Sequence, residues 1–540
     1  MKIKLESLLQ ELGSPGKYQV CIFLLLALNY FPVVFNHIVM AFIGRPPQYE
    51  CYNASYEDPT YILNLTSTTD NSFWQSEKTE YGKCSTKYFL SDSTNASEIF
   101  NCDSSPNGKW RYDGKESSIA SEWDLVCSNA YLSRLATTIY FIGVMVGGLI
   151  FGYLADKFGR KKIMLVTLFT PVAIGVLTAL VKTYYLFVGL RFLQGIFIQG
   201  LQTTTYVMVM ELFLPKYRGT AGTVLECFWG VTVIMMAGIA YLLQDWRNIQ
   251  LAISVPSALA LTYIWMVPET LRWLMIKDKI DQAQKIVKRI TKFNNLSFPA
   301  RTMDELQIQI EAKDNEPGRQ YMFYDLLRTP ILRKHSLILF YLWFSVCVGY
   351  YGMTFKIAGL AGNHYLTFFI SGCVDLVAFI MVIYLIQRFG RRIPLLVFFV
   401  IGSVSCIVAG SIPIALAGAS GTAEKVFAII GKFGMAGVFS IIFVYSSELY
   451  PTVIRSIGMG TCAFWARLGG VVAPQILVLG DFTHKSVSVI MFGVISLIAS
   501  LLVLFLPETA NRKLPDTIED AESIDAFKGS NGSEEEPVEL

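Results

Sequence analysis

The chain has 540 residues, of which 53% are hydrophobic and only 16% are charged, and its mean hydropathy is +0.45. So high an apolar content with so few charges excludes a soluble protein built of ordinary globular domains, and it indicates an integral membrane protein. The net charge of +3 is small and spread over loops, so it gives no sign of nucleic-acid binding.

Apolar runs of about 20 residues, long enough to cross a hydrocarbon core as helices, recur along the chain. No strands are indicated, so we expect an all-α membrane protein with twelve transmembrane helices. We place them by residue number near 18–43, 133–154, 163–181, 184–212, 220–243, 248–267, 334–356, 365–387, 393–414, 424–447, 456–478 and 486–506.

Lys and Arg residues fix the expected orientation, because they gather in the loops after spans two, four, eight and ten. Those loops should be cytoplasmic, and an even number of spans puts both termini on the same side. No cleavable signal peptide is apparent, since the first apolar run is too long. The expected segments are a cytoplasmic N-terminus (1–17), helix 1 (18–43), an extracellular loop (44–132), helices 2 to 6 (133–267), a cytoplasmic linker (268–333), helices 7 to 12 (334–506) and an acidic cytoplasmic tail (507–540).

The loop after the first span is the one large hydrophilic segment expected outside. It is acidic and holds three sequons, at Asn53, Asn64 and Asn95. It also holds four cysteines, which in an oxidising space favour two disulfides with three pairings open. We therefore predict a glycosylated ectodomain whose disulfides involve Cys51, Cys84, Cys102 and Cys127.

Three motifs return once, in order and at nearly one spacing. "DKFGRKK" returns as "QRFGRRI" 231 residues later, "ELFLPKYRG" as "ELYPTVIRSIG" after 237, and "VPETLRW" as "LPETANR" after 239. The chain therefore contains two six-helix halves joined by the basic segment between them.

Two halves of parallel topology are the architecture of the major facilitator superfamily, in which a midplane site is exposed alternately to each side. "GYLADKFGRKK", between spans two and three, resembles its best-known signature. The resemblance implies a gate in which Asp156 faces a helix end or an Arg, while Arg160 pairs with carboxylates of the other bundle when the cytoplasmic side is closed. Alternatively, these cations only enforce orientation. We assign to the gating pairs Asp156, Arg160, Glu211, Arg218, Arg391, Glu448 and Arg455.

Four further features resemble the organic cation, organic anion and carnitine transporter family over nearly the whole chain. They are the loop ending in "SEWDLVC", then "PETLRWL", "SSELYPTVIRSIGMG" and "LPETANRKLPDTIEDAE". The sugar porter branch shares the gate motifs but lacks such a loop. The resemblance implies a polyspecific secondary transporter of the plasma membrane that works by alternating access.

Ionisable residues inside spans are costly in lipid and mark candidate substrate contacts. Glu226, Asp375, Lys432 and Arg467 are the deepest. Glu226 resembles a substrate position of organic cation transporters, whereas Arg467 is the residue that the anion and carnitine branches carry. Asp375 and Lys432 are equally well a structural pair. The anion branch places a Lys four residues after this acid, and Phe379 stands there instead.

Aromatic rings on the spans expected to line the site can hold an ammonium by cation–π contact. The candidates are Trp343, Tyr350, Tyr351, Tyr206 and Tyr445, together with Gln202, and of these Trp343, Tyr350 and Tyr206 match substrate positions of the family.

The substrate expected from these residues is an organic cation or carnitine-like zwitterion, with an organic anion as the alternative. A receptor that keeps the transporter fold is the alternative of another class. No catalytic constellation, metal-spaced Cys or His pairs, or nucleotide loop stands out, so we expect no enzyme activity and no cofactor. The coupling ion stays open.

Overall fold

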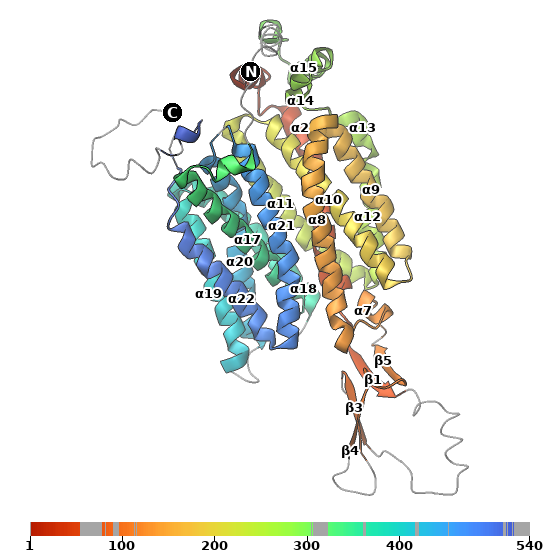
Figure 1. The fold of residues 1–540 in the computed structure, drawn as a ribbon. Helices are drawn as coiled ribbons and strands as arrows, with labels where there is room; N and C mark the ends of the chain where they lie inside the picture. The colour runs from red at the N-terminus through yellow and green to blue at the C-terminus, as the bar shows by residue number, and fades with distance from the viewer. Residues whose placement is uncertain are drawn as a thin grey trace, which may run out of the picture.

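The structure is a computed structural model of the chain. It describes residues 2–53, 78–81, 83–89, 97–112, 114, 116–303, 305, 322–359, 363–415, 421–451, 453–510, 515, 517–520 and 522. Within these residues, twelve long helical segments form two side-by-side bundles (Figure 1). This is the fold that the apolar runs and the repeated motifs predict.

The first bundle begins with a broken helix made of α2 (Lys17–Ala27), α3 (Tyr30–Ile38) and α4 (Met40–Ile43). Its sixth segment is also broken, because the 3-10 helix η2 (Val255–Thr262) joins α12 (Trp246–Ser254) to α13 (Tyr263–Met266). Between them lie four long helices: α8 (Ala130–Phe158), α9 (Arg160–Leu180), α10 (Tyr184–Leu212) and α11 (Pro215–Leu243).

The second bundle consists of six long helices: α17 (Pro330–Ala358), α18 (His364–Phe389), α19 (Arg392–Ala415), α20 (Gly421–Leu449), α21 (Arg455–Phe482) and α22 (Lys485–Val503). Across the interface α8 packs against α21 and α11 against α18. Among the described residues, eleven helical segments are long and apolar enough to cross a membrane. The exception, α10, has the length, but Arg191 and three glutamines lower its hydropathy.

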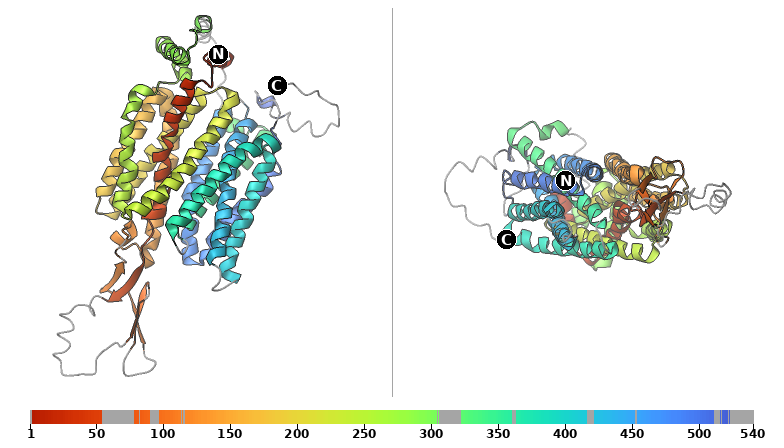
Figure 2. Two further views of the ribbon diagram at one scale, coloured as in Figure 1. Left: turned by 180° about the vertical axis from the view of Figure 1, so that it is seen from behind. Right: turned by 90° about the horizontal axis from the view of Figure 1, so that it is seen from below.

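The two ends of the bundles carry different structures (Figures 1 and 2). At one end, here called the terminal end, lie α1 (Lys2–Glu11) and the linker helices α14 (Leu271–Ile276) and α15 (Ile280–Asn294). The short 3-10 helix η3 (Phe323–Leu326) precedes α17. At the opposite end, here called the strand end, the segment after α4 projects away from the helices.

Five strands build this projection, which corrects the expectation that no strands are present. β1 (Tyr49–Asn53) pairs antiparallel with β5 (Gly108–Tyr112). β3 (Ser85–Phe89) lies between β2 (Lys78–Tyr81) and β4 (Ser97–Asn101), antiparallel to both. Of the sequons, Asn53 ends β1, whereas Asn64 and Asn95 lie outside the described residues.

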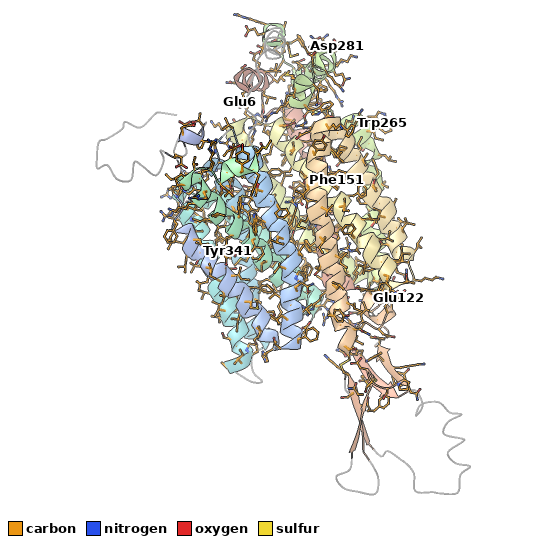
Figure 3. The ribbon with its side chains drawn as sticks, viewed as in Figure 1. Glu6, Glu122, Phe151, Trp265, Asp281 and Tyr341 are labelled. Carbon is orange, nitrogen blue, oxygen red and sulfur yellow. A yellow bond between two sulfur atoms is a disulfide. The ribbon has the colours of Figure 1, made fainter. Side chains whose placement is uncertain are left out.

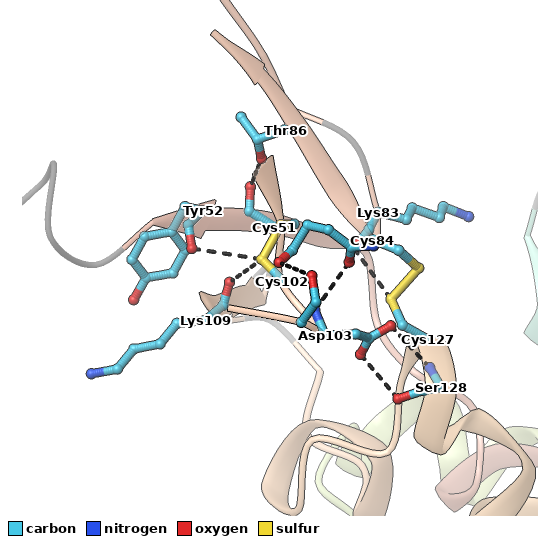
Figure 4. Close-up of a disulfide and its surroundings, with 12 residues drawn as sticks. Cys51, Tyr52, Lys83, Cys84, Thr86, Cys102, Asp103, Lys109, Cys127 and Ser128 are labelled. Carbon is cyan, nitrogen blue, oxygen red and sulfur yellow. Dashed lines mark hydrogen bonds between the residues drawn. A yellow bond between two sulfur atoms is a disulfide. The ribbon is translucent and has the colours of Figure 1, made fainter. Parts of the chain in front are cut away.

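Two disulfides hold the strands together, as the cysteine count predicts, and the structure selects one of the three pairings. Cys51 pairs with Cys102, and Cys84 pairs with Cys127 (Figure 4). The second bridge ties the strands to the 3-10 helix η1 (Cys127–Asn129), which leads directly into α8. The strands are thus covalently fastened to the first bundle.

The stem between β5 and α8 is also fastened to the first bundle by polar contacts. It contains the short helix α7 (Ile119–Glu122). The Glu122 carboxylate accepts a hydrogen bond from Trp246 Nε1 at 2.7 Å and pairs with Arg247. The Trp123 indole donates to the Lys182 carbonyl at 3.0 Å.

The repeated "FGR" motifs form the same turn in both bundles. Gly159 (φ +111°) separates α8 from α9, and Gly390 (φ +78°) separates α18 from α19. After each glycine, the first amides of the next helix donate to a glutamate of the repeated "PET" motif. Glu269 accepts from Arg160 and Lys161, and Glu508 accepts from Arg391 and Arg392. Each glutamate therefore caps a helix N-terminus, where its charge also opposes the positive end of the helix dipole.

Replacing Gly159 with Ala should destabilise the protein by about 1–3 kcal/mol, because a side chain at this positive φ is strained. A Cβ atom there would also lie 2.5 Å from Glu269 Oε2. Gly152→Ala is the matched control, since its Cβ would meet no atom within 4 Å. Thermal unfolding of the purified protein measures the effect. Equal melting temperatures for both variants would contradict the role of this turn.

Candidate functional site

Two opposite charges, Asp375 on α18 and Lys432 on α20, meet in the interior of the second bundle. Their side chains are fully buried, and Lys432 Nζ lies 2.9 Å from Asp375 Oδ2. Lys432 also donates to Ser371 Oγ at 2.6 Å, and the Tyr350 hydroxyl donates to Asp375 at 3.0 Å. The two charges are therefore compensated within the protein. This is the geometry expected if Asp375 and Lys432 are a structural pair and not substrate contacts.

Tyr350 carries this network across to the first bundle. The indole of Trp229 on α11 donates to the Tyr350 hydroxyl at 2.8 Å. Trp229, Tyr350 and Asp375 thus form a chain of hydrogen bonds that joins the bundles near their centre. No pattern in the sequence singles out Trp229, because its partners come from other helices.

Glu226 on α11 stands in contrast to this compensated pair. Its side chain is buried, with 8% of the residue exposed, yet among the described residues its carboxylate forms no ion pair or hydrogen bond. Tyr30 and Tyr206 lie within electrostatic range of its charge. Glu226 stands three residues before Trp229 in the same helix, so both side chains lie on one face of α11.

Among the described residues, Arg467 on α21 also has no partner of opposite charge. One guanidinium nitrogen donates to the Ala463 carbonyl one turn earlier, and Nε has no hydrogen-bond partner. Tyr351 lies within electrostatic range of both Arg467 and Glu226. An acid and a base thus stand near one tyrosine without pairing with each other.

His37 on α3 is the main site residue that sequence reasoning missed. It is 2% exposed, and its Nδ1 lies 2.8 Å from the Val33 carbonyl. Aromatic rings surround it, with centroids 5.6 to 6.2 Å away; they belong to Tyr140, Phe141, Trp229 and Tyr351. These rings come from both bundles, so no local signal in the sequence could have assembled them.

The remaining candidate substrate residues differ in where they lie. Trp343 packs inside the second bundle, where its indole donates to Ser446 Oγ at 2.9 Å and its ring lies 4.5 Å from that of Phe443. Tyr206 and Phe443 come from different bundles, and their ring centroids are 5.7 Å apart. Gln202 is partly exposed on α10, one turn before Tyr206.

Tyr445 lies away from this group, contrary to the expectation that it faces the site. It is fully buried, and its hydroxyl donates to the Pro507 carbonyl at 2.5 Å, beyond the end of α22. Its ring therefore belongs to the packing of the terminal end. The tyrosine lies on an expected cavity-lining helix, but helical rotation turns it toward the chain that follows the last span.

The gate residues form equivalent pairs in the two bundles. Arg160 lies 3.2 Å from Glu211 and 2.9 Å from Asp156, whose side chain is 72% exposed. Arg391 lies 2.9 Å from Glu448, which also accepts from Thr509. In this structure each arginine finds its carboxylate within its own bundle; the expected pairing of Arg160 with the other bundle stays a prediction.

Two other expected gate arginines act on backbone carbonyls. Arg218 Nε donates to the carbonyls of Met210 and Phe213, at the end of α10. Arg455 Nε donates to the Tyr450 carbonyl, just after α20. Both arginines thus satisfy carbonyls left open at a helix C-terminus, where a cation is favourable.

The capping glutamates of the repeated turns differ in their proton affinity. Burial raises the pKa of Glu269, and its hydrogen bonds with backbone amides only partly offset this. Burial also acts to raise the pKa of Glu508, but four backbone amides outweigh it and the pKa is lowered. Duplicated geometry therefore does not mean identical electrostatics.

Further contacts between the bundles lie at the strand end. They comprise an ion pair, three hydrogen bonds and ring packing, and they join Arg134 to Asp481 (2.7 Å), Gln475 to Thr138 (2.6 Å), Tyr365 to Glu116 (3.1 Å), Arg45 to the Ala358 carbonyl (3.3 Å) and Phe42 to Phe368 (centroids 4.7 Å apart). Glu116 belongs to the stem, so the strand-bearing segment takes part in joining the two bundles at this end.

A separate pocket lies at the terminal end of the first bundle, away from these central side chains. Polar groups of Tyr18, Gln19, Glu211, Glu269 and Thr270 line it among apolar residues. Because it lies beside the gate pair and not between the bundles, we do not assign it to the substrate.

Comparison with known proteins identifies the family. The family model described as "Sugar (and other) transporter" matches residues 25–520. Solute carrier family 22 member 3 from Mus musculus is 33% identical, with 96% of this chain and 95% of that protein covered. The organic cation transporter protein of Drosophila melanogaster is 31% identical, covering 96% and 94%, and solute carrier family 22 member 7 from Mus musculus is 31% identical, covering 96% and 97%.

Among solved structures, the inward-open xylose transporter XylE from E. coli resembles the fold, with a TM-score of 0.64 over 94% of this chain and 99% of that one. Its sequence is 16% identical, so the likeness concerns the fold alone. The fold, the duplicated gate motifs and the full-length relatives agree: the chain belongs to solute carrier family 22 of the major facilitator superfamily, a family of membrane transporters of organic ions.

Proposed function

We propose that this protein moves small organic cations or carnitine-like zwitterions across the plasma membrane by alternating access. The observation that carries the proposal is the buried Glu226 carboxylate without a partner among the described residues. A buried charge is costly unless something compensates it, and a ligand ammonium would do so. The aromatic rings around His37 add faces that attract a cation.

Arg467 favours the zwitterion over a plain amine. Its guanidinium stands near Tyr351, as does Glu226, and has no carboxylate partner. A ligand with an ammonium at one end and a carboxylate at the other would satisfy both residues at once. The same arginine is the observation that keeps an organic anion as the second candidate, since an anion would use Arg467 alone.

The proposal includes an orientation with the terminal end in the cytoplasm. The Lys and Arg residues of the loops support it, as do the disulfides at the strand end, which require an oxidising space. With the bundles joined at the strand end, the substrate would leave toward the terminal end. The alternative to a transporter is a receptor that keeps the fold but moves no substrate. Saturable tracer uptake by the wild type would exclude it.

Glu226→Gln should weaken apparent binding of an amine or zwitterion by about 1–3 kcal/mol, because it removes the opposite charge and keeps the shape. Arg467→Ala should weaken the zwitterion and leave a pure cation nearly unchanged. Concentration-dependent uptake of an amine, a carnitine-like zwitterion and an organic anion measures both effects. Glu424→Gln is the control, since that carboxylate pairs with Lys356 away from Glu226.

Transport of the organic anion alone by the wild type would contradict this reading. The contradiction would be complete if Glu226→Gln left anion uptake unchanged while Arg467→Ala abolished it, and the protein would then be an anion carrier.

Glu211→Gln should slow transport while leaving surface expression largely intact, because reorientation requires the pairs of Arg160 to form and break. Asp156→Asn, at an exposed position of the same cluster, should have a smaller effect. Surface biotinylation combined with initial uptake rates separates turnover from abundance. Normal turnover in Glu211→Gln would contradict a gating role and would leave the "GYLADKFGRKK" motif only the role of setting the orientation in the membrane.

The topology can be tested by glycosylation. Glycosidase treatment should lower the apparent mass of the wild type, and combined replacement of Asn53, Asn64 and Asn95 with Gln should abolish that shift. Epitopes at either terminus should be reachable by antibody only after permeabilisation. Labelling of a terminal epitope on intact cells would refute the orientation.

A further inference from the structure

A basic stripe runs along one face of the linker helix α15. Lys285, Lys288, Arg289 and Lys292 follow the spacing i, i+3, i+4 and i+7, which places them on one side of a helix, and all four are exposed. The opposite face of α15 is buried and consists of Ala283, Val287, Ile290 and Thr291. Because Asp281 is the one acidic residue of α15, the stripe is strongly positive.

One residue of the stripe, Arg289, reaches the end of the sixth span. Arg289 Nη1 donates to the Trp265 carbonyl at 3.3 Å, in the last turn of α13. Beside it, Lys161 Nζ donates to the Ile264 carbonyl at 2.7 Å. Trp265 is 71% exposed and lies at the terminal end of the first bundle, below the helix that carries Asp281 in the view of Figure 3.

This position identifies the partner that the charges fit. An exposed tryptophan at the end of an apolar span is typical of the membrane interface, at the depth of the lipid headgroups. Arg289 donates to a carbonyl of that same turn, so this residue of the stripe reaches the level of the tryptophan.

We propose that the stripe of Lys285, Lys288, Arg289 and Lys292 binds the headgroups of anionic phospholipids in the leaflet at the terminal end. Each basic residue near an anionic leaflet strengthens association by roughly fivefold, and salt screens the effect. Lys161 connects this surface to the gate, because its amide is one of those capped by Glu269. The inference concerns lipid binding and does not rest on the proposed substrate.

The test uses the full-length protein in mixed micelles of phosphatidylcholine and phosphatidylserine, with retained lipids counted by native mass spectrometry. One variant replaces the four stripe residues with Gln. The control removes the same charge from exposed positions at the same end outside the stripe, by Lys277→Gln, Arg301→Gln, Arg333→Gln and Lys334→Gln. A triple variant that spares Arg289 serves if loss of its contact with Trp265 impairs folding.

The wild type and the control should retain phosphatidylserine in preference to phosphatidylcholine, and the stripe variant should lose at least about tenfold of that preference. High salt should reduce the preference of the wild type. Retention by the stripe variant, or an equal loss in the control, would overturn the proposal. Displacement of the lipid by soluble glycerophosphoserine at equal concentration would also overturn it, because the site would then recognise a free anion.

Discussion

A charge buried in a membrane protein must be compensated, and this constraint divides the four deepest candidate residues of the sequence into two pairs. Asp375 and Lys432 compensate each other and are held further by Tyr350 and Ser371. Glu226 and Arg467 have no such partners in the part of the chain that the structure describes, although both lie within electrostatic range of Tyr351. The first pair therefore fits a structural role, and the other two residues are where a charged ligand would contribute most.

The internal duplication of the chain accounts for the turns and ion pairs at the terminal end, but not for the contacts at the strand end. Each bundle repeats a glycine turn, a capping glutamate and an arginine–glutamate pair, so the two gates share one design. The strand end has no such repeat, because the stem that follows the strands belongs to the first bundle alone. Glu116 of that stem reaches Tyr365 of the second bundle, so the stem contributes a contact between the bundles that has no counterpart in the other half.

Much of the fold could be predicted from the sequence, because its signals are local or repeated. Apolar runs gave the helices, and three recurring motifs gave the two bundles. The strands were missed because they are short and lie in a polar segment without long alternating patterns. The pairing of Cys51 with Cys102 could not be chosen either, since it depends on which strands meet.

The candidate site was predictable only in part, for the same physical reason. A lone carboxylate in an apolar run, such as Glu226, is conspicuous in the sequence. His37 and Trp229 are not, because their importance comes from rings and hydroxyls contributed by other helices. Tyr445 shows the converse error: it lies on an expected helix but faces away from the site.

The most direct test of the central claim is infrared difference spectroscopy of the purified protein with and without a carnitine-like zwitterion. If the ligand ammonium compensates Glu226, binding should shift a carboxyl band that is absent in Glu226→Gln, while the control Glu424→Gln keeps it. A difference spectrum that is the same in the wild type and in Glu226→Gln, at saturating ligand, would contradict the account.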